Sequence, residues 1–252
     1  MRYTQKNAEV IESWRRKYKL IWFEPVSHET FEKARRGEWD ITLTPLKPVP
    51  HAWIGDVSGK KILGLAAGGA QQMPIMAALG AECTILDISP SQLENERVVS
   101  RREGYQIEVI EGDMSQPLPF ADAAFDMIIN PISNHYIEDV LPVFAECYRV
   151  LKPGGYLLCG LDTGIHYIFD ENEEKVVHSL PFNPLKDPAL YDEMMRRDLG
   201  LQFSHTLEEQ IGGQLKAGFR LLDIYEDTNI AGLFYEMNIP KYMATRSQKP
   251  LP

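Results

Sequence analysis

The sequence predicts an α/β fold built on a doubly wound, mostly parallel sheet, and three observations support this prediction. From Lys60 to about Gly160, short apolar runs alternate with helical patterns, as in βαβ units whose sheet is buried on both faces. The first apolar run, Lys61–Leu65, breaks into a turn of small residues. The chain has 252 residues, of which 44% are hydrophobic, and this is enough for one core and a small extra lobe.

Each strand is expected where a short apolar run is bounded by turn residues. Parallel strands that are buried on both faces give continuous apolar runs rather than an alternating pattern. The expected strands are Lys61–Leu65, Cys83–Leu86, Ile107–Ile110, Phe125–Ile129, Gly155–Gly160, Phe219–Tyr225 and a seventh within Leu233–Met243.

Helices are expected between the strands, and most have a start or a stop signal. The first covers about Gln71–Leu79 and ends at Gly80. Ser89 opens the second as an N-cap, with a proline at the first helical position. A third is expected over Ile137–Leu151, because apolar residues recur there at helical spacing. Thr206 starts a fourth with a capping box.

Two stretches fall outside this alternation and lie where a lid could form. Residues 1–55 are expected to form an aromatic N-terminal arm or cap, and residues 56–252 the main domain, with an insertion at about 163–204. All four tryptophans lie in or near the arm. Trp14 and Trp22 are expected to anchor it to the core. Trp53, just before the first strand, is expected to face a ligand.

The charge distribution and the cysteine spacing limit the classes of partner that we expect. The net charge is −10, and residues 1–50 hold ten basic and seven acidic side chains, against sixteen and twenty-nine in the rest. This argues against a nucleic-acid partner. The three cysteines lack metal-ligand spacing, so we expect no metal and a cytoplasmic protein. No apolar run approaches the roughly 18 residues of a membrane span, so no membrane partner is expected. The oligomeric state stays unknown.

Ligands of an open parallel sheet bind beyond the carboxyl ends of its strands. The turn Ala66–Ala70 follows the first strand, and Asp87 ends the second about 20 residues later, where its carboxylate can accept from both hydroxyls of a ribose. Asp113 and Met114 follow the third strand and are expected to bond and sandwich an adenine ring. The expected cofactor contacts are Ala66, Ala67, Gly68, Gly69, Gln71, Asp87, Ile88, Gln92, Asp113, Met114 and Asn130.

Several of these residues have a plainer alternative role. Asp87 can instead cap the turn before Ser89, and Asp113 can bond only its own loop backbone. Gln71, at the start of the first helix, can face solvent. It is their order along the chain, each at a matching strand end, that favours a nucleotide-like ligand.

Further motifs extend the pattern beyond the turn and Asp87. Tyr148–Leu157 has the sequence YRVLKPGGYL, and Phe120–Asp126 has the sequence FADAAFD. With these motifs, the stretch from Lys60 to Gly160 resembles the class I S-adenosylmethionine-dependent methyltransferases. More narrowly, residues 63–72 and 130–136 resemble a group of uncharacterised bacterial methyltransferase-like proteins. The resemblance implies a Rossmann-like sheet of seven strands with an antiparallel last strand, and S-adenosylmethionine as the cofactor.

The chain departs from the family in its first strand and turn. Gly64 stands where the family has an acidic residue that helps to organise the methionine end of the cofactor, and Ala66 and Ala70 replace two glycines. Alanine allows close approach of the backbone if its φ is negative, so we expect cofactor binding to survive. Asp162, at the end of the fifth strand, is not expected to replace the missing acid.

The fourth strand ends in a polar cluster, Asn130–Tyr136, that is expected to line the reaction pocket. The acceptor is expected to be a small molecule. If it needs a general base, His135 is the first candidate and His166 the second, although both can instead be packing histidines. The expected substrate contacts are Trp53, Ser133, Asn134, Tyr136 and His166.

Two other functions stay open. Gly64 is compatible with a protein that binds S-adenosylmethionine or its demethylated product without catalysis. A nicotinamide-dependent oxidoreductase is disfavoured by Ala66 and by the motif Arg149–Gly155.

Overall fold

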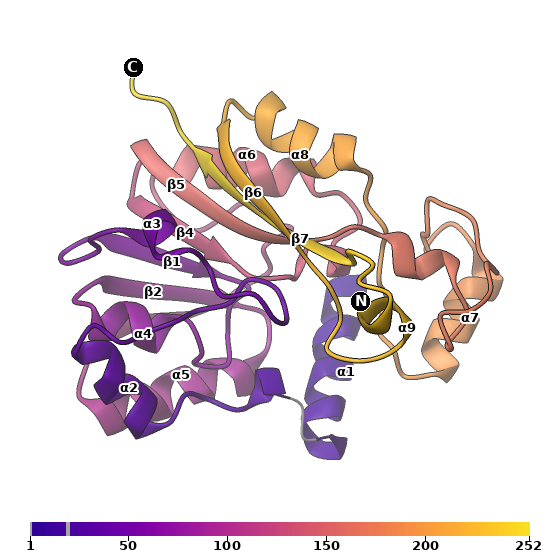
Figure 1. The fold of residues 1–252 in the computed structure, drawn as a ribbon, viewed down its shortest axis with the longest axis horizontal. Coiled ribbons are helices and arrows are strands. Elements are labelled where there is room, and N and C mark those ends of the chain that lie inside the picture. Colours follow the sequence, from indigo (N-terminus) through magenta and orange to yellow (C-terminus); the bar gives the residue numbers. More distant parts are fainter. Residues whose placement is uncertain (1, 19–20) are drawn as a thin grey trace.

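The computed structural model describes residues 2–18 and 21–252 and shows one seven-stranded sheet of order β3-β2-β1-β4-β5-β7-β6 (Figure 1). β7 runs antiparallel to both β5 and β6, whereas the pairs among β1 to β5 are parallel. The predicted fold class is therefore confirmed. The strands are β1 Lys61–Leu65, β2 Glu82–Asp87, β3 Ile107–Glu111, β4 Phe125–Asn130, β5 Leu151–Asp162, β6 Arg220–Asp227 and β7 Tyr242–Gln248.

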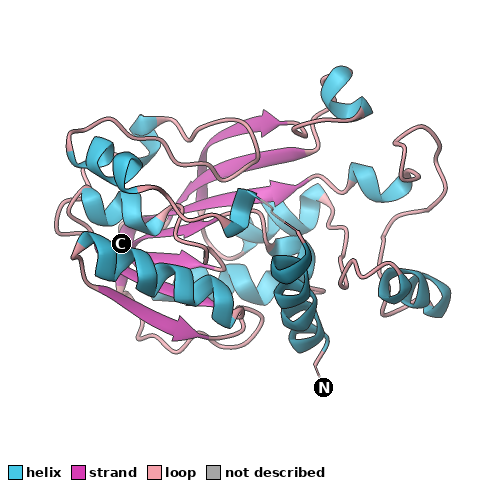
Figure 2. Ribbon diagram, turned by 90° about the horizontal axis from the view of Figure 1, so that it is seen from below, coloured by secondary structure: helices cyan, strands magenta, loops and turns pink. Residues whose placement is uncertain are grey.

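Helices cover both faces of the sheet and make two apolar layers. On one face lie α2 (His28–Arg35), α4 (Met73–Ala78) and α5 (Pro90–Glu103), and on the other α6 (Leu141–Val150) and α8 (Leu207–Lys216) (Figures 1 and 2). The strands supply both layers, because alternate side chains of a strand point to opposite faces. In β1, for example, Ile62 joins one core cluster and Leu63 the other.

The seventh strand lies later in the chain than expected. The short helix α9 (Leu233–Glu236) occupies the segment where that strand was predicted, and β7 begins only at Tyr242. The strand has a weak apolar pattern because Thr245 and Ser247 are fully buried. Both hydroxyls instead donate hydrogen bonds to the side-chain oxygen of Gln214, at 3.2 and 2.6 Å. A buried strand that satisfies polar side chains internally lacks the apolar run on which the prediction relied.

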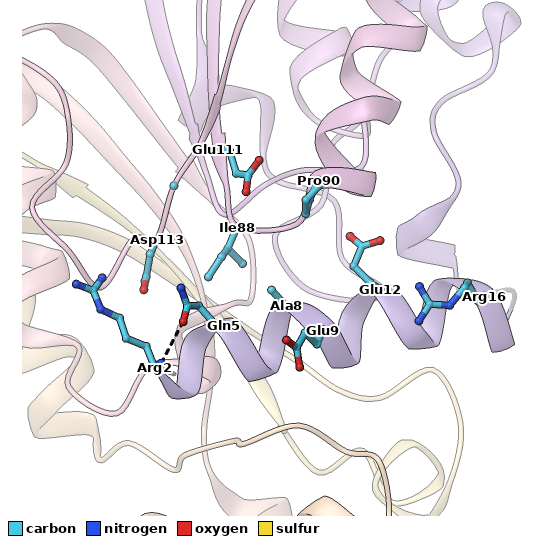
Figure 3. A pocket seen from close by; sticks show the side chains of 11 residues that line it. Arg2, Gln5, Ala8, Glu9, Glu12, Arg16, Ile88, Pro90, Glu111 and Asp113 are labelled. Carbon is cyan, nitrogen blue, oxygen red and sulfur yellow. Dashed lines mark hydrogen bonds between the residues drawn. The ribbon is translucent and has the colours of Figure 1, made fainter.

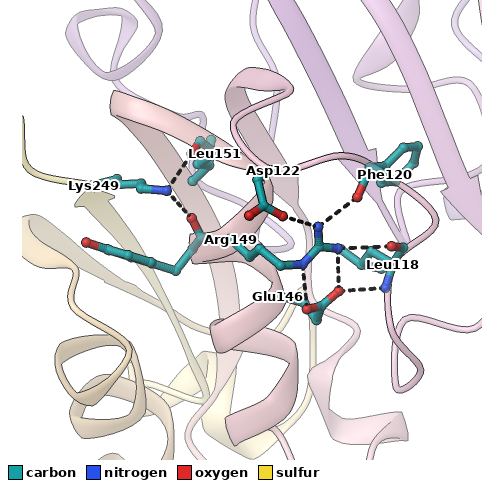
Figure 4. Close-up of polar contacts among 8 residues, drawn as sticks. Leu118, Phe120, Asp122, Glu146, Arg149, Leu151 and Lys249 are labelled. Carbon is teal, nitrogen blue, oxygen red and sulfur yellow. Dashed lines mark hydrogen bonds and ion pairs between the residues drawn. The ribbon is translucent and has the colours of Figure 1, made fainter.

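The motif Tyr148–Leu157, which resembles the methyltransferases, holds the segment before β4 in place (Figure 4). The Arg149 guanidinium, at the end of α6, donates to the backbone oxygens of Leu118 and Phe120 and to the carboxylates of Asp122 and Glu146, at 2.7 to 3.0 Å. One side chain thus fixes the segment before β4 from the helix before β5. Arg149 in this motif thus supports the sheet through the segment before β4.

The N-terminal arm begins with α1 (Tyr3–Lys17), which stands across the carboxyl ends of the strands rather than packing on a sheet face (Figures 1 and 2). After η1 (Ile21–Phe23) and α2, the arm ends in α3 (His51–Ile54). The Trp14 indole donates to the Asp198 backbone oxygen at 2.6 Å, so Trp14 anchors α1 to the insertion rather than to the core. The Trp22 side chain is 47% exposed, so the expectation that it anchors the arm is wrong.

The insertion holds η3 (Ile165–Ile168) and α7 (Pro188–Arg196) and has an apolar cluster of its own, which includes Tyr167 and Phe203. It is tied to α1 through Asn7, whose amide accepts from the Leu201 N–H at 2.7 Å and donates to the Leu201 oxygen at 2.9 Å. α1 and the insertion therefore form one continuous cover at the carboxyl edge of the sheet. In the described part of the chain, no helix is long and apolar enough to cross a membrane.

Candidate functional site

The turn after β1 is held by hydrogen bonds from its own backbone. Gly68 N–H donates to the Asp87 carboxylate at 2.9 Å, Gly69 N–H to the Gln92 oxygen at 3.2 Å, and Ala70 N–H to the Glu96 carboxyl at 2.8 Å. These donors are thus engaged within the protein. What Ala66, Ala67, Gly68 and Gly69 offer a ligand is a surface without bulky side chains, to which it can approach closely.

The two alanines of the turn adopt left-handed backbone conformations. Ala66 has φ 47° and Ala70 has φ 60°, so the expected negative φ is wrong at both positions. An L-residue pays about 1 to 2 kcal/mol for this conformation, which glycine does not. The turn thus keeps the shape that glycines normally allow, and surrounding contacts hold the alanines in it.

Asp87 lies at the centre of these contacts. Its two carboxylate oxygens accept from Gly68 N–H and Ser89 N–H, both at 2.9 Å. The plainer role, a cap of the turn before Ser89, is therefore present. Burial raises the pKa of Asp87, and these hydrogen bonds offset part of that effect. Since each carboxylate oxygen can accept more than one hydrogen bond, contact with a ribose stays a prediction.

A cavity of about 510 Å³ lies between α1 and the ends of β2 and β3 (Figure 3). Ile88 and Asp113, two of the residues expected to contact the cofactor, line it, and their contact with a ligand stays a prediction. The Asp113 carboxylate also accepts from Ser115 in its own loop and from the Thr4 hydroxyl of α1, at 2.6 to 2.9 Å. α1 is therefore fastened directly to the residue expected to bond adenine.

Met114 does not line this cavity. Its side chain is 6% exposed, belongs to the core, and lies with its sulfur 4.0 Å from the Ser133 hydroxyl. The prediction that Met114 sandwiches an adenine ring is not supported here, and Ile88 is an apolar side chain that does line the cavity. The sequence shows an apolar residue after Asp113, but it does not show that the Met114 side chain points into the core.

The two glutamines expected to touch the cofactor connect the arm to the turn. The Gln92 amide donates to the backbone oxygens of Trp22 and Gly68, at 3.2 and 3.4 Å. The Gln71 amide donates to the Glu24 oxygen at 3.3 Å. Both side chains thus place the arm against the turn, so the arm and the predicted cofactor site share residues.

Asn130 joins three strand ends. Its amide donates to the Leu65 oxygen of β1 at 2.7 Å and to the Ser133 hydroxyl at 2.9 Å, while its oxygen accepts from the Cys159 thiol of β5 at 3.2 Å. Asn130 is 1% exposed. It therefore fixes the start of the polar cluster Asn130–Tyr136 relative to the turn.

A buried group of ionisable side chains lies where β4 and β5 end. The Asp162 carboxylate lies 3.4 Å from the His166 imidazole and accepts from Gly164 N–H at 2.6 Å. Burial opposes its ionisation, but His166, His135 and Gly164 together hold the pKa of Asp162 below its usual value. Sequence reasoning considered Asp162 only as a cofactor contact and missed its place beside both histidines. Its spacing of four residues from His166 was the available signal.

His135 is the most strongly shifted histidine of this group. Burial lowers the pKa of its imidazole to about 4, with Asp162 opposing this shift and His166, Lys241 and His205 adding to it. Within the described residues, its buried Nδ1 has no hydrogen-bond partner. His135 is thus a neutral imidazole at pH 7.

The remaining residues expected to contact the substrate lie in two different places. Ser133, Asn134 and Tyr136 lie on or beside η2 (Asn134–Tyr136) with His135, and burial raises the pKa of the Tyr136 hydroxyl well above its usual value. Trp53 lies elsewhere: its side chain is 2% exposed, packs against Tyr225 of β6, and donates to Asp223 at 2.9 Å. The prediction that Trp53 faces a ligand is therefore wrong. Its position before β1 puts it at the opposite end of that strand from the turn.

The titration of His135 tests directly whether its imidazole is buried. An unfolded histidine has a pKa of about 6.5, so the folded protein binds fewer protons here, and His135 lowers stability as the pH falls from 6.5 towards 4. We expect NMR spectra to show a neutral His135 imidazole down to about pH 5. A His135 signal that titrates near pH 6.5 would contradict the buried position.

The two hydrogen bonds between Asn7 and Leu201 are expected to hold α1 to the insertion. Asn7→Ala leaves the Leu201 N–H and oxygen without their partner, which costs about 1 to 3 kcal/mol at a buried site. We expect faster amide exchange in α1 and in residues 198–203 together, measured by mass spectrometry. Glu9→Ala, at an exposed position on the same helix, is the control and should change neither segment. Faster exchange in α1 alone would show that the two segments are independent.

Comparison with known proteins agrees with the fold. Residues 63–159 match a family described as a methyltransferase domain. A solved S-adenosylmethionine-dependent methyltransferase from Mesorhizobium loti superimposes with a TM-score of 0.63 at 17% identity, over 79% of this chain and 94% of that one. The [4+2]-cyclase SpnF shares the fold with a TM-score of 0.54 at 19% identity, over 77% of each chain.

A curated relative covers nearly the whole chain. The uncharacterized methyltransferase YbaJ of Bacillus subtilis (strain 168) is 40% identical over 235 residues, which are 90% of this chain and 91% of the relative. The similarity thus includes the arm or the insertion in addition to the sheet. The chain belongs to the class I S-adenosylmethionine-dependent methyltransferase family.

Proposed function

We propose that the protein transfers a methyl group from S-adenosylmethionine to a small-molecule acceptor. The observation that supports this most is the shared edge of the sheet. There Ile88 and Asp113 line a cavity, and Asp87, next to Ile88 in the chain, holds the small-residue turn through Gly68 N–H. The buried group of Asp162, His166 and His135 lies where β4 and β5 end. The same edge of the sheet thus offers a site for a nucleotide-like cofactor and, apart from it, a group of ionisable side chains suited to proton transfer.

The residues present fit S-adenosylmethionine. The turn Ala66–Gly69 lacks side chains that would block a ligand, Asp87 would accept from the ribose hydroxyls, and Ile88 with Asp113 would hold the adenine. When bound, the cofactor supplies a methyl group on a sulfonium, which is already activated for displacement. The main task of the protein is then to hold an acceptor in line with that methyl group and to exclude water.

His135 is the proposed general base. Its neutral imidazole and unused Nδ1 let it accept a proton from a hydroxyl or an acidic carbon, and the nearby Asp162 carboxylate favours the resulting cation. His166, which already faces Asp162, is the second candidate. A small acceptor agrees with the net charge of −10, which disfavours nucleic acid, and we propose no membrane partner. α1 and the insertion are proposed to close over it.

A second candidate function is cofactor binding without methyl transfer. Gly64 in place of the family's acid supports it, and the fold itself does not decide, since the structural neighbour SpnF is described as a cyclase. The two candidates differ in one product. Formation of S-adenosylhomocysteine with any acceptor from a panel of phenols, acids and amines would exclude the binding-only function.

Thermal unfolding with added ligands tests the proposal at its first step. A ligand at 100 times its Kd stabilises the folded state by about 2.7 kcal/mol, which raises Tm measurably. We expect a higher Tm with S-adenosylmethionine and with S-adenosylhomocysteine, and no change with NAD. A higher Tm with NAD alone would instead support an oxidoreductase.

A further inference from the structure

Position 64 of β1 has no room for the acid that the family carries there. A Cβ built on Gly64 would lie 2.8 Å from the Ile85 side chain and 3.0 Å from the Met73 sulfur. Both neighbours are fully buried, so neither can move aside freely. The core has therefore filled this place with apolar atoms, and a carboxyl group that acts on the turn must come from another element.

A carboxyl group does reach the turn, from α5. Glu96 is fully buried, and its Oε1 accepts from Ala70 N–H at 2.8 Å, while its Oε2 has no partner among the described residues. Burial raises the pKa of Glu96 to about 8, so the group carries a proton at neutral pH. A protonated carboxyl can stay buried at this place without a paired cation.

The same face of α5 holds the rest of the turn. Gln92, one helical turn before Glu96, accepts from Gly69 N–H through its backbone oxygen, and its amide donates to the Gly68 oxygen. Ala70, which Glu96 holds, is one of the two alanines with positive φ. A residue in that conformation needs contacts that keep it there, and at Ala70 the carboxyl of Glu96 is such a contact.

We propose that Glu96 is the positioning residue of the cofactor turn, which it fixes from α5 in a chain that lacks the family's acid in β1. Its carboxyl fixes Ala70 N–H, and thereby the shape that the turn presents to the methionine end of S-adenosylmethionine. This inference rests on the proposed function, because it assigns the turn to that cofactor. The acid thus lies on α5, which packs on β2 and β3, rather than in β1.

Two substitutions of Glu96 test the proposal. Glu96→Gln keeps an oxygen that can accept from Ala70 N–H, whereas Glu96→Leu has a similar volume and no acceptor. Because Glu96 is fully buried and leucine has a similar volume, we expect the leucine variant to fold, which circular dichroism checks. Glu94→Leu, at an exposed position of the same helix, is the matched control.

Calorimetry with S-adenosylhomocysteine and amide exchange at Ala70 are the two readouts. We expect Glu96→Leu to bind about tenfold more weakly, equivalent to about 1.4 kcal/mol, and to exchange the Ala70 amide at least tenfold faster. Glu96→Gln and Glu94→Leu should stay within about threefold of the wild type in both. This pattern separates a specific contact with the turn from a general loss of stability.

Contrary results are equally distinct. Wild-type affinity and exchange in Glu96→Leu, or a glutamine variant as weak as the leucine variant, would overturn the role of Glu96. If the wild-type protein bound no S-adenosylhomocysteine, the proposed function would fail by itself. Amide exchange at Ala70 would then still decide whether Glu96 holds the turn.

Discussion

Asp87→Ala is expected to weaken the binding of S-adenosylmethionine by about 100-fold. The substitution removes the carboxylate that accepts from Gly68 N–H and Ser89 N–H, and with it the predicted acceptor for the ribose. Hydrogen bonds to a charged group contribute about 1.5 to 3 kcal/mol each, and the loss of one or two accounts for a factor of this size. Calorimetry with S-adenosylhomocysteine gives the measurement.

Two further variants make this result specific. Asp87→Asn keeps one acceptor oxygen and should fall between the wild type and the alanine variant. Glu94→Ala removes an exposed carboxylate of α5 that pairs with Arg101, and should leave affinity unchanged. Circular dichroism should show that all three variants are folded. An alanine variant that binds as tightly as the wild type would show that Asp87 only caps its own turn.

Gly64→Asp is expected to destabilise the protein by about 3 to 5 kcal/mol, although it restores the residue type usual in the family. The new side chain would meet Ile85 and Met73 within 3.0 Å and would bury a carboxylate with no cation beside it. Unfolding in urea measures the loss as a lower midpoint at an unchanged slope. Cofactor affinity should not improve.

Two companion variants separate the causes of this loss. Gly64→Ala adds the steric conflict without the charge and should cost about 1 to 3 kcal/mol. Met73→Ala in the Gly64→Asp background makes room and should return part of the stability lost to the clash, relative to Met73→Ala alone. If Gly64→Asp were as stable as the wild type and bound the cofactor more tightly, the packing explanation of Gly64 would be wrong.

Much of the sheet could be predicted from the sequence, because strands buried on both faces are written as apolar runs. β1 to β4 lie within a residue of their expected bounds, whereas β5 begins at Leu151 instead of Gly155. β7 was misplaced because Thr245 and Ser247 are buried with their hydroxyls bonded to Gln214. Pairs so distant along the chain are invisible to local patterns.

The candidate site was predictable as a set of strand ends, but not as a network. The rule that ligands lie beyond parallel strands indicated Asp87 and Asp113. It could not show that Thr4, 109 residues away, bonds Asp113, or that a carboxyl from Glu96 holds the turn. The prediction for Trp53 was wrong for a related reason, because its neighbour Tyr225 comes from β6, far along the chain.

A crystal structure with S-adenosylhomocysteine tests the central claim most directly. The ribose hydroxyls should lie within hydrogen-bond distance of the Asp87 carboxylate, with the adenine beside Ile88 and Asp113 and the sulfur facing the side of His135. Such a complex would also show the space left for the acceptor. Adenosine bound away from Asp87, or a turn between Ala66 and Ala70 that makes no contact with the ligand, would contradict the assignment of this edge of the sheet as the cofactor site.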